Sequence, residues 1–430
     1  PPGVLSIRIR RAKHSPIVTM MMDRAASVFR AITSPDPKAV LSRLKPGTPI
    51  RTMLLACCLV LLSGCELKRW VHNGLKVGPE YCRPGASVSD DWIDASDGHL
   101  LAVQSSDPEW WSTLNDPMLA RLIRSAYEQN LSLREAGWRV MQARAIRDIN
   151  VGNIFPQSQQ GFGQYDRILE SESLATSAPL RAFDQWSTGF GLAWEVDVWG
   201  RYRRSIASAE ANLQASIGDR DAIMICLFAD VATAYTEYRT SQEQLRYAKK
   251  NVQIQESSLA LTQKKAKTGL TGFTSVYLAQ SSLEATRAGI PNIEINLRQT
   301  SNRLCTLLGI PTQDLFEMLG EGAIPVAPAE VALGIPANLL RRRPDIRAAE
   351  RSIAAQSEQI GIAIADLYPA FTITGQFAWE SERFGDLFTS ASTAGSVGPG
   401  FQWNLLNYGR IANNVQLQRY GLQELIASYQ

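Results

Sequence analysis

Cysteine side chains are the strongest candidates for covalent chemistry in this sequence, and their placement is uneven. Three of the six, Cys57, Cys58 and Cys65, lie within or just after the apolar run 53–62. That run follows several basic residues and is too short to span a bilayer as a helix. Its length is typical of the hydrophobic region of a secretory signal. The thiol of Cys65 is therefore a candidate for modification during export.

The residues L-S-G-C at 62–65 close this apolar run. Small residues ahead of a cysteine suit a peptidase that cleaves before Cys65 once its thiol has been diacylated, and the tetrapeptide resembles the bacterial lipoprotein signal. An ordinary signal with an incidental cysteine is the alternative. In such lipoproteins an Asp after the cysteine favours inner-membrane retention, so Glu66 leaves sorting to the outer membrane as the expectation. We assign 1–64 to a leader and lipoprotein signal peptide. Within it, 1–50 shows no periodicity and resembles an over-extended reading frame or a long n-region.

The remaining polar residues form no recognisable catalytic or metal-binding group. The 430-residue chain has three histidines and lacks C-x-x-C, H-E-x-x-H, G-x-S-x-G and Gly-rich phosphate-binding motifs. A net charge of +3 gives no electrostatic basis for binding nucleic acid. The basic run 341–343 is interpreted as a helix entry, because Pro344 and Asp345 follow it. We therefore expect no enzyme activity, no cofactor and no metal.

Apolar residues recur every seven positions in three long stretches, which predicts long helices packed as coiled coils. The first begins at Leu119. The second begins near Arg201 and continues for over sixty residues with no breaker apart from Gly218, a length of ~100 Å if helical. The third should be antiparallel to the second about a turn near residue 270. The seam positions are Leu119, Ala126, Leu133 and Val140, then Met224, Val231, Tyr238, Leu245, Val252, Leu259 and Ala266, then Val276, Leu283, Ile290, Leu297 and Leu304.

Two cysteines fall on the second and third of these helices. Cys226 and Cys305 lie at different distances from the turn, and the resulting axial stagger is ~13 Å. That separation exceeds the reach of a disulfide. We expect both to be small buried side chains.

Between the helices the sequence changes to two-residue alternation, which predicts β-strands at 186–198, 371–379 and 396–405. A fourth strand is expected after Pro156, although its residues alternate poorly. One face of the strands is bulky and apolar, while the other is small or polar. The bulky positions are Trp186, Phe190, Leu192, Trp194, Phe371, Ile373, Phe377, Trp379, Phe401 and Trp403.

These strands have two interpretations. A soluble sandwich would alternate in the same way, but the strand lengths, the Trp-rich face and the export signal favour a membrane barrel whose bulky residues face lipid. Four strands cannot close a barrel, and an open strand edge is not tolerated in lipid. Several chains must therefore contribute strands to one barrel.

The chain also contains an internal repeat. The pattern L-R-x-A…F-P at 133–156 matches I-R-x-A…Y-P at 346–369, and G-x-x-W…W-G-R at 191–201 matches G-x-x-W…Y-G-R at 400–410. Each copy predicts a helix, two strands and a second helix in that order. The predicted organisation is an extended segment at 65–117, a first repeat at 118–311, a linker at 312–338 and a second repeat at 339–430. About 90 residues of the second repeat are missing by comparison, so a truncated chain is expected.

Four further motifs point to a known family. They are V-G-P-E-Y-x-R-P at 77–84, W-W at 110–111 with D-P-x-L at 116–119, L-L-x-R-R-P-D-I at 339–346, and A-x-A-D-L-Y-P at 363–369. Together with the repeat they resemble the lipoprotein (OprM/NodT-like) branch of the TolC-type outer-membrane factors. The resemblance covers the chain from residue 62 onward. It implies a mainly α fold with some β, in which long coiled-coil helices form an α-barrel and four strands per chain join a trimeric, twelve-stranded transmembrane β-barrel.

The resemblance also implies partners and one docking site. Members of this family act with a periplasmic adaptor and an inner-membrane pump of the RND type, and the adaptor docks at the periplasmic helical turn. The matching residues here are Thr268, Gly269, Leu270, Thr271, Ser275 and Val276. Gly269 suits a helix C-cap, and Thr271 or Thr274 the next N-cap. The family usually has Asp where Ser275 stands, which weakens the inferred docking chemistry.

The sequence therefore predicts an outer-membrane channel subunit, a homotrimer that conducts small molecules passively while a pump supplies the energy. A periplasmic coiled-coil lipoprotein acting as a scaffold or adaptor, without a pore, is the alternative. The two would differ in trimer formation and in ion conductance. An enzyme is the third possibility, and the missing site residues speak against it.

Overall fold

The computed structural model describes residues 70–85, 100–101, 109–169, 182–327, 331–332 and 340–430. The chain divides into two units, Pro1–Arg69 and Trp70–Gln430. The predicted signal peptide and Cys65 lie outside the described residues. All elements below belong to the second unit.

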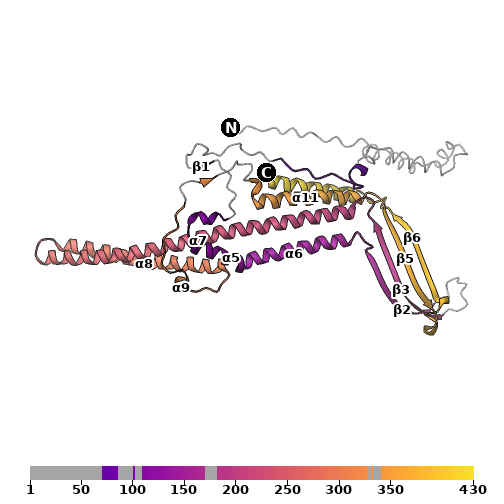
Figure 1. Cartoon of the computed structure of the whole chain (residues 1–430), viewed down its shortest axis with the longest axis horizontal. Helices are drawn as coiled ribbons and strands as arrows, with labels where there is room; N and C mark the ends of the chain where they lie inside the picture. Colours follow the sequence, from indigo (N-terminus) through magenta and orange to yellow (C-terminus); the bar gives the residue numbers. More distant parts are fainter. Residues whose placement is uncertain (1–69, 86–99, 102–108, 170–181, 328–330, 333–339) are drawn as a thin grey trace, which may run out of the picture. The chain divides into compact units, whose positions relative to one another are not determined.

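The longest element is α7 (Arg201–Lys267), a helix of 67 residues that forms a hairpin with α8 (Phe273–Leu308). Figure 1 shows the two helices side by side up to their turn. The ion pair between Arg303 and Asp230 at 3.1 Å joins positions equally far from residues 266–267. The predicted antiparallel pairing about a turn near residue 270 is thus confirmed. A continuous helix of this length follows from a seam with no internal proline.

The first helical stretch differs from the prediction, because it is two helices. α5 (Pro117–Gln129) ends at Asn130, and α6 (Leu131–Gly152) begins directly after it. Asn130 leaves the helical conformation, and its side-chain oxygen accepts the Leu133 amide at 2.9 Å. Its amide nitrogen donates to the Leu307 carbonyl at 2.9 Å. The heptad phase continues across the break, so the seam alone does not reveal it.

The main hydrophobic core lies where α5, α7 and α8 meet. Val231, Ala234 and Leu304 are fully buried there, together with Leu119 and Ala126. All of these except Ala234 are predicted seam residues, and the heptad pattern thus identified the packing face. Of the two cysteines on this hairpin, Cys305 is buried and Cys226 is exposed. The expectation of a buried Cys226 was wrong, because the neighbouring Leu227 takes the buried position.

Four antiparallel strands form one sheet in the order β2-β3-β5-β6. Their bounds are Ser158–Leu169 for β2, Ala182–Val196 for β3, Ala370–Ser381 for β5 and Thr393–Gln402 for β6. The poorly alternating stretch after Pro156 is therefore a full strand, paired with β3 along its length. The last strand begins and ends about three residues earlier than predicted, and Trp403 directly follows it.

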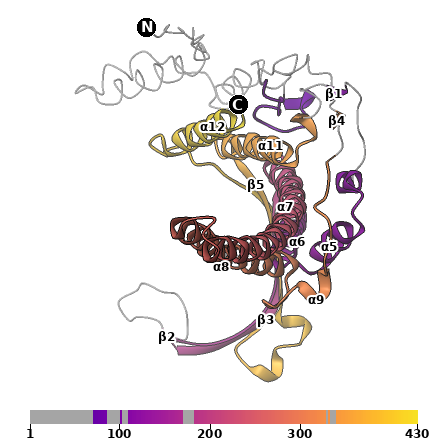
Figure 2. The same cartoon turned by 90° about the vertical axis from the view of Figure 1, so that its left-hand side faces the viewer.

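The helices that flank the sheet follow the same lateral order as the strands. α11 (Pro344–Ala365) packs between α7 and α12 (Arg410–Tyr429), and α6 packs on the other side of α7. Figure 2 shows α12, α11, α7 and α6 in succession. The order α6, α7, α11, α12 thus matches β2, β3, β5, β6, and each helix adjoins the strand to which it is connected.

The backbone adopts the same conformation at matching positions of the two helix–strand–strand–helix units. α6 and α11 both contain 22 residues, and their N-cap residues Asn130 and Arg343 share φ near −60° and ψ 127°. α7 and α12 both begin after a glycine, Gly200 and Gly409, with φ of 80° and 82°. Positive φ is the conformation that glycine adopts without strain.

The smaller elements complete the described chain. A two-stranded parallel sheet pairs β1 (Leu100–Leu101) with β4 (Val331–Ala332). The short helices are η1 (Trp110–Leu114), α9 (Phe316–Leu319), η2 (Phe384–Asp386) and η3 (Ser390–Ser392). No helix in the part of the chain that the structure describes has a stretch long and apolar enough to cross a membrane.

Candidate pore wall and helical tip

The register of the sheet sorts its side chains onto two faces. Residues directly opposite one another in an antiparallel pair share a face. Phe190 lies opposite Phe377, and Phe371 lies opposite Phe401. The bulky residues predicted on three separate strands are therefore brought onto one face, which we call the aromatic face. Its predicted members within the strands are Trp186, Phe190, Leu192, Trp194, Phe371, Ile373, Phe377, Trp379 and Phe401.

The aromatic face carries most of its side chains at the surface of the sheet. Phe190 is 65% exposed and Phe401 70%. Trp186, Trp194, Ile373 and Trp379 are half-buried. β2 contributes little bulk, since Gly161 and Gly163 lie opposite Phe190 and Thr188. An apolar face of this extent on a soluble chain requires a cover.

The opposite face, which we call the polar face, has a different composition. Its residues on β3 and β5 alternate with the aromatic ones and include Ser187, Gly191, Thr372, Thr374 and Gln376. Three carboxylates lie on it, those of Asp166, Glu195 and Glu380, and the described strands place no Lys or Arg there. Such a face suits contact with water.

Aromatic ring pairs lie at both ends of the aromatic face. At the end away from the helices, Tyr165 packs on Trp186 with ring centroids 4.5 Å apart. There Trp379 also packs on Phe388 of the loop after β5, at 5.9 Å. At the end next to the helices, Phe371 and Phe401 pack at 6.3 Å. The middle of the face holds the opposed pair Phe190 and Phe377, with Gly161 and Gly163 beside them on β2.

Tryptophan side chains tie the strands to the helix ends. The Trp194 indole nitrogen donates to the Ile154 carbonyl at 2.9 Å. The Trp403 indole nitrogen donates to the Leu367 carbonyl at 3.0 Å. Trp199 donates to the Pro369 carbonyl at 2.8 Å. Each indole thus satisfies a carbonyl between a helix and the strand that follows it.

The segment beginning at Trp70 is fastened to this junction. Trp70 packs on Trp199, with ring centroids 5.6 Å apart. The Val77 amide donates to the Trp199 carbonyl at 3.0 Å. Arg203 donates to the Gly74 and Leu75 carbonyls at 2.6 and 2.9 Å. The start of the described chain is therefore held beside the end of the sheet that adjoins the helices.

The hairpin tip has the predicted helix stop but a different helix start. Gly269 has φ 74°, its amide donates to the Ala266 carbonyl, and the Leu270 amide donates to the Lys265 carbonyl. This is the Schellman arrangement, which satisfies the last carbonyls of α7. The N-cap of α8 is Gly272, without a side-chain cap. The expected Thr271 or Thr274 cap was wrong, because the Thr271 hydroxyl donates to the Ser275 hydroxyl instead.

The predicted tip residues divide into exposed and packed positions. Leu270 is 78% exposed, and the neighbouring Phe273 67%. Thr268, Thr271 and Ser275 are also at the surface or partly so. Val276 is instead buried in the hairpin. The tip therefore presents apolar and hydroxyl side chains on a rigid turn, with Val276 supporting the turn from within.

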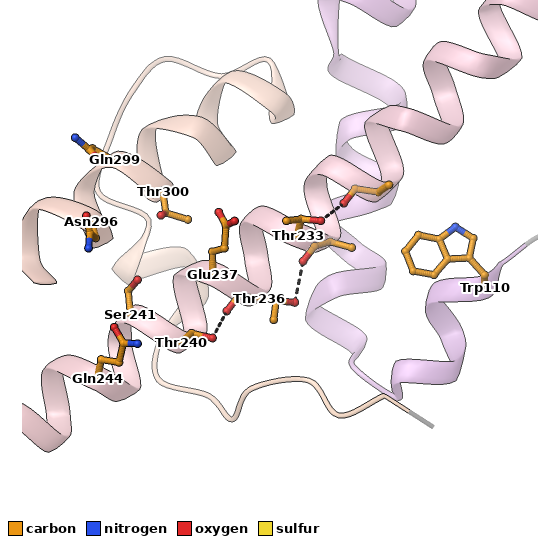
Figure 3. Close-up of a pocket in the computed structure, with 12 residues that line it drawn as sticks. Trp110, Thr233, Thr236, Glu237, Thr240, Ser241, Gln244, Asn296, Gln299 and Thr300 are labelled. Carbon is orange, nitrogen blue, oxygen red and sulfur yellow. Dashed lines mark hydrogen bonds between the residues drawn. The ribbon is translucent and has the colours of Figure 1, made fainter. Parts of the chain in front are cut away.

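A shallow groove of about 650 Å³ lies along the middle of the α7–α8 hairpin. Figure 3 shows threonines of α7 along this groove, with Asn296 and Gln299 of α8 opposite and Trp110 at one end. The hydroxyls of Thr233, Thr236 and Thr240 donate to carbonyls one turn earlier in α7. With those bonds made, the three threonine hydroxyl protons are not available to a ligand.

Two buried arginines were not singled out by the sequence. Arg204 is 1% exposed and donates to Glu358 at 2.6 Å. Arg239 is also buried and donates to the Leu319 and Gly320 carbonyls, at 2.9 and 2.7 Å. It also donates to the Tyr235 hydroxyl, and burial raises the pKa of Tyr235 above its ordinary value. Neither arginine lies at a predicted seam position, and the partners Glu358, Leu319 and Gly320 are remote in sequence, so the heptad pattern gave no signal for them.

In this chain, long helices are continued by an antiparallel sheet with one apolar and one polar face. This architecture is the one expected of a subunit of a membrane channel. The family model described as outer membrane efflux protein matches residues 122–310 and 335–430. The chain belongs to this family. Channels of the family form trimers and work with adaptor and inner-membrane pump partners.

Individual relatives agree with this assignment. Nodulation protein T of Rhizobium leguminosarum bv. trifolii is 30% identical over 371 residues, covering 83% of this chain and 73% of that protein. The pyoverdine export outer membrane protein OpmQ of Pseudomonas putida is 32% identical over 332 residues, covering 75% and 69%. The structure of the outer-membrane channel OprN matches with a TM-score of 0.77 and 29% identity, covering 82% of this chain and 78% of that one.

These relationships settle the general function. The chain is a subunit of an outer-membrane efflux channel, and the family is a conduit rather than an enzyme. It localises to the outer membrane. The predicted family, function and localisation are confirmed.

Proposed function

We propose that three copies of this chain close a twelve-stranded barrel in the outer membrane and serve as the passive exit duct for small molecules. The observation that carries the proposal is a sheet with one apolar and one polar face, whose two edge strands pair with no further strand among the described residues. An inner-membrane pump of the RND type supplies the energy, and a periplasmic adaptor connects the pump to the helical tip.

The edge strands of the sheet explain why several copies of the chain are needed to close a barrel. Within the sheet, β2 pairs only with β3, and β6 only with β5. Backbone groups left without partners in hydrocarbon cost several kcal/mol each. Pairing β6 of one copy with β2 of the next removes both edges, and three copies bring twelve strands together. The outer helices α6 and α12 then meet at the same boundary, because their order matches that of the strands.

The aromatic face has the height of a membrane band. Trp186 and Trp194 are eight residues apart on β3, and Trp379 and Phe371 are eight apart on β5. Eight residues of strand span about 27 Å. A strand tilt of about 40° reduces the span across the membrane to about 20 Å, close to the apolar band of about 25 Å between the aromatic girdles of such barrels. We assign the aromatic face to lipid and the polar face to the pore.

A lipid anchor at Cys65 agrees with this membrane position. Trp70 follows Cys65 by five positions, so the chain between their Cα atoms reaches at most about 18 Å. Trp70 packs beside Trp199 at the junction of helices and strands, which is where the periplasmic membrane surface lies in this arrangement. An acylated Cys65 therefore needs no long tether.

Matching hydrogen bonds and backbone conformations in the two halves of the sequence support two structural repeats. Trp194 and Trp403 occupy matched positions and bond to carbonyls at matched positions, those of Ile154 and Leu367. Gly200 and Gly409 begin the following helices in the same conformation. We propose repeats at 118–311 and 339–430, with 65–117 and 312–338 as the segments beside them.

Adaptor docking is assigned to the exposed part of the tip. Thr268, Gly269, Leu270, Thr271 and Ser275 present apolar and hydroxyl groups, and Val276 holds the turn. A rigid turn with exposed apolar side chains is a suitable hot spot for a partner helix pair. One relative named above is a pyoverdine export protein, and we extend the proposal to small molecules as a class.

The decisive experiment is to purify the lipidated protein and measure its oligomeric state and its conductance in planar bilayers. We expect detergent-resistant trimers that conduct ions. A cysteine pair placed on β2 and β6 should crosslink between copies, whereas a matched pair placed on the aromatic and polar faces of β3 should not. Monomers without conductance would overturn the proposal and favour a scaffold without a pore.

A further inference from the structure

The loop that joins β5 to β6, residues 382–392, folds back onto the aromatic face of the sheet. It lies at the end of the sheet away from the helices (Figure 1) and contains η2 and η3. Phe384 packs edge-on against Trp186 of β3, with ring centroids 5.0 Å apart. Phe388 packs against Trp379, two residues before the end of β5, at 5.9 Å. The β5–β6 loop therefore turns toward the aromatic face and away from the polar one.

The β5–β6 loop satisfies several of its polar groups internally. The hydroxyls of Thr389 and Ser392 donate to the Asp386 carbonyl, at 2.9 and 2.6 Å. The Leu387 amide donates to the Phe384 carbonyl at 3.2 Å, and the Leu387 side chain is buried. Groups that have partners within the protein do not need water, so these contacts allow the loop to lie against lipid.

Two large rings of the loop remain uncovered. Phe384 is 61% exposed and Phe388 69%, although each already rests on a tryptophan of the sheet. These rings extend the aromatic face beyond the ends of its strands. An apolar surface of this size requires a cover. Because the rings are continuous with the aromatic face, the cover that fits them is the one proposed for that face, which is lipid.

We propose that the β5–β6 loop inserts Phe384 and Phe388 into the outer leaflet of the outer membrane, where lipid acyl chains cover both rings. This inference rests on the proposed assignment of the aromatic face to lipid. It adds a membrane contact made by a loop to the one made by the strands. It also places this loop beside the rim of the pore, on the lipid side, and not across the pore mouth.

The charged residues of the loop set the depth of insertion. Glu382, Arg383 and Asp386 are exposed, and a charged group within the hydrocarbon is costly. The ion pair between Arg167 and Asp184 lies on the aromatic face at this same end of the sheet. Amphipathic segments lie in the membrane surface with their apolar side chains at the boundary of head groups and acyl chains. The insertion is therefore shallow, with these charges among the head groups and the two rings just below them.

The test uses nitroxide labels on trimers reconstituted into vesicles of phosphatidylethanolamine and phosphatidylglycerol. The exposed Cys82 and Cys226 are first replaced by serine, and the buried Cys305 is left in place. A cysteine for labelling is then introduced as Phe388→Cys. Oxygen is enriched among acyl chains, whereas a water-soluble nickel chelate is excluded from them. We expect the ratio of oxygen to nickel accessibility at Phe388→Cys to be several times that of a site facing water.

Two neighbouring residues of β6 supply matched controls. Val397 lies opposite Gly375 on the aromatic face, and Ser396 lies opposite Gln376 on the polar face. Both side chains are exposed in the single chain. In the trimer, Val397→Cys should give the accessibility ratio of lipid, and Ser396→Cys that of water.

The two controls separate failure of this inference from failure of the proposed function. A ratio at Phe388→Cys that matches Val397→Cys supports insertion. A ratio that matches Ser396→Cys, while Val397→Cys still reports lipid, overturns the inference and leaves the proposed function intact. A water-like ratio at Val397→Cys as well would overturn the assignment of the aromatic face to lipid. If Phe388→Cys does not assemble into trimers, Phe384→Cys is measured in its place and read against the same two controls.

Discussion

The guanidinium of Arg204 donates to the Glu358 carboxylate at 2.6 Å and so links α7 to α11. Arg204 is almost fully buried, and its remaining side chain lies against Gly361, where any Cβ would come within 2.2 Å of the Arg204 Cδ. The segment at Gly78 also approaches this glycine closely, because a Cβ on Gly78 would lie 2.7 Å from the Gly361 Cα. Three segments distant in sequence thus meet at one ion pair.

We predict that Glu358→Ala destabilises the protein strongly. Removing Glu358 leaves the buried Arg204 charge without a partner, which costs about 3–5 kcal/mol when a buried pair is broken. The loss should appear as a lower temperature of trimer dissociation. The exposed pair Arg139–Glu135 on α6 serves as the control, since exposed pairs contribute little. Equal effects of Glu358→Ala and Glu135→Ala would contradict the argument.

The indole bonds at the base of the sheet give a second prediction. Trp194→Phe and Trp403→Phe keep an aromatic ring but leave the Ile154 and Leu367 carbonyls without their donors. Each loss should cost about 1 kcal/mol. Because the bonds are equivalent, the two variants should lower the thermal stability of the trimer by similar amounts.

The comparison for the indole variants is Phe190→Leu, which changes an exposed aromatic side chain in mid-sheet without breaking any hydrogen bond. A shift of the melting temperature in only one of the two tryptophan variants would argue against the equivalence of the junctions.

A strand was predictable from the sequence where the side chains on its two faces differ in size. In β3 the large residues alternate with Gly191, Ala193 and Ser187, so the strand is evident. In β2 the aromatic face holds Gly161 and Gly163, and the period disappears although the strand is fully paired. The strand β2 forms because it pairs with β3, and the sequence of β2 alone does not reveal that pairing.

Features that depend on distant contacts were not predictable. Asn130 interrupts the helix although the heptad phase continues across it. Its side-chain amide donates to the carbonyl of Leu307, which is far away in sequence. The burial of Arg204 depends in the same way on Glu358. At the tip, the glycine stop of α7 is local chemistry and was predicted, whereas the α8 cap depends on which hydroxyl Thr271 contacts.

Gly200 provides a third prediction, because the backbone there has φ 80° and a Cβ would lie 2.8 Å from the Lys76 Cα. Gly200→Ala should destabilise the protein by more than the 1–2 kcal/mol or so that the left-handed conformation alone costs. The segment at Lys76 must also move. Gly191→Ala is the control, since nothing lies within 4 Å of its added Cβ. Limited proteolysis after residue 70 and thermal unfolding should distinguish the two, and similar behaviour would refute the clash.

The tip provides the last prediction, which concerns export rather than stability. Leu270→Asp places a charge on the exposed apolar surface of the turn without disturbing the buried Val276 beneath it. If the adaptor docks there, the variant should still assemble trimers and conduct ions in bilayers, yet it should fail to support efflux in cells. Loss of one hot-spot contact of about 2 kcal/mol lowers affinity roughly thirtyfold. Leu261→Asp alters another exposed leucine of the same hairpin, on α7 more than one turn before the tip, and should retain efflux. Normal efflux with Leu270→Asp, or an equal defect in both variants, would exclude the turn as the docking point.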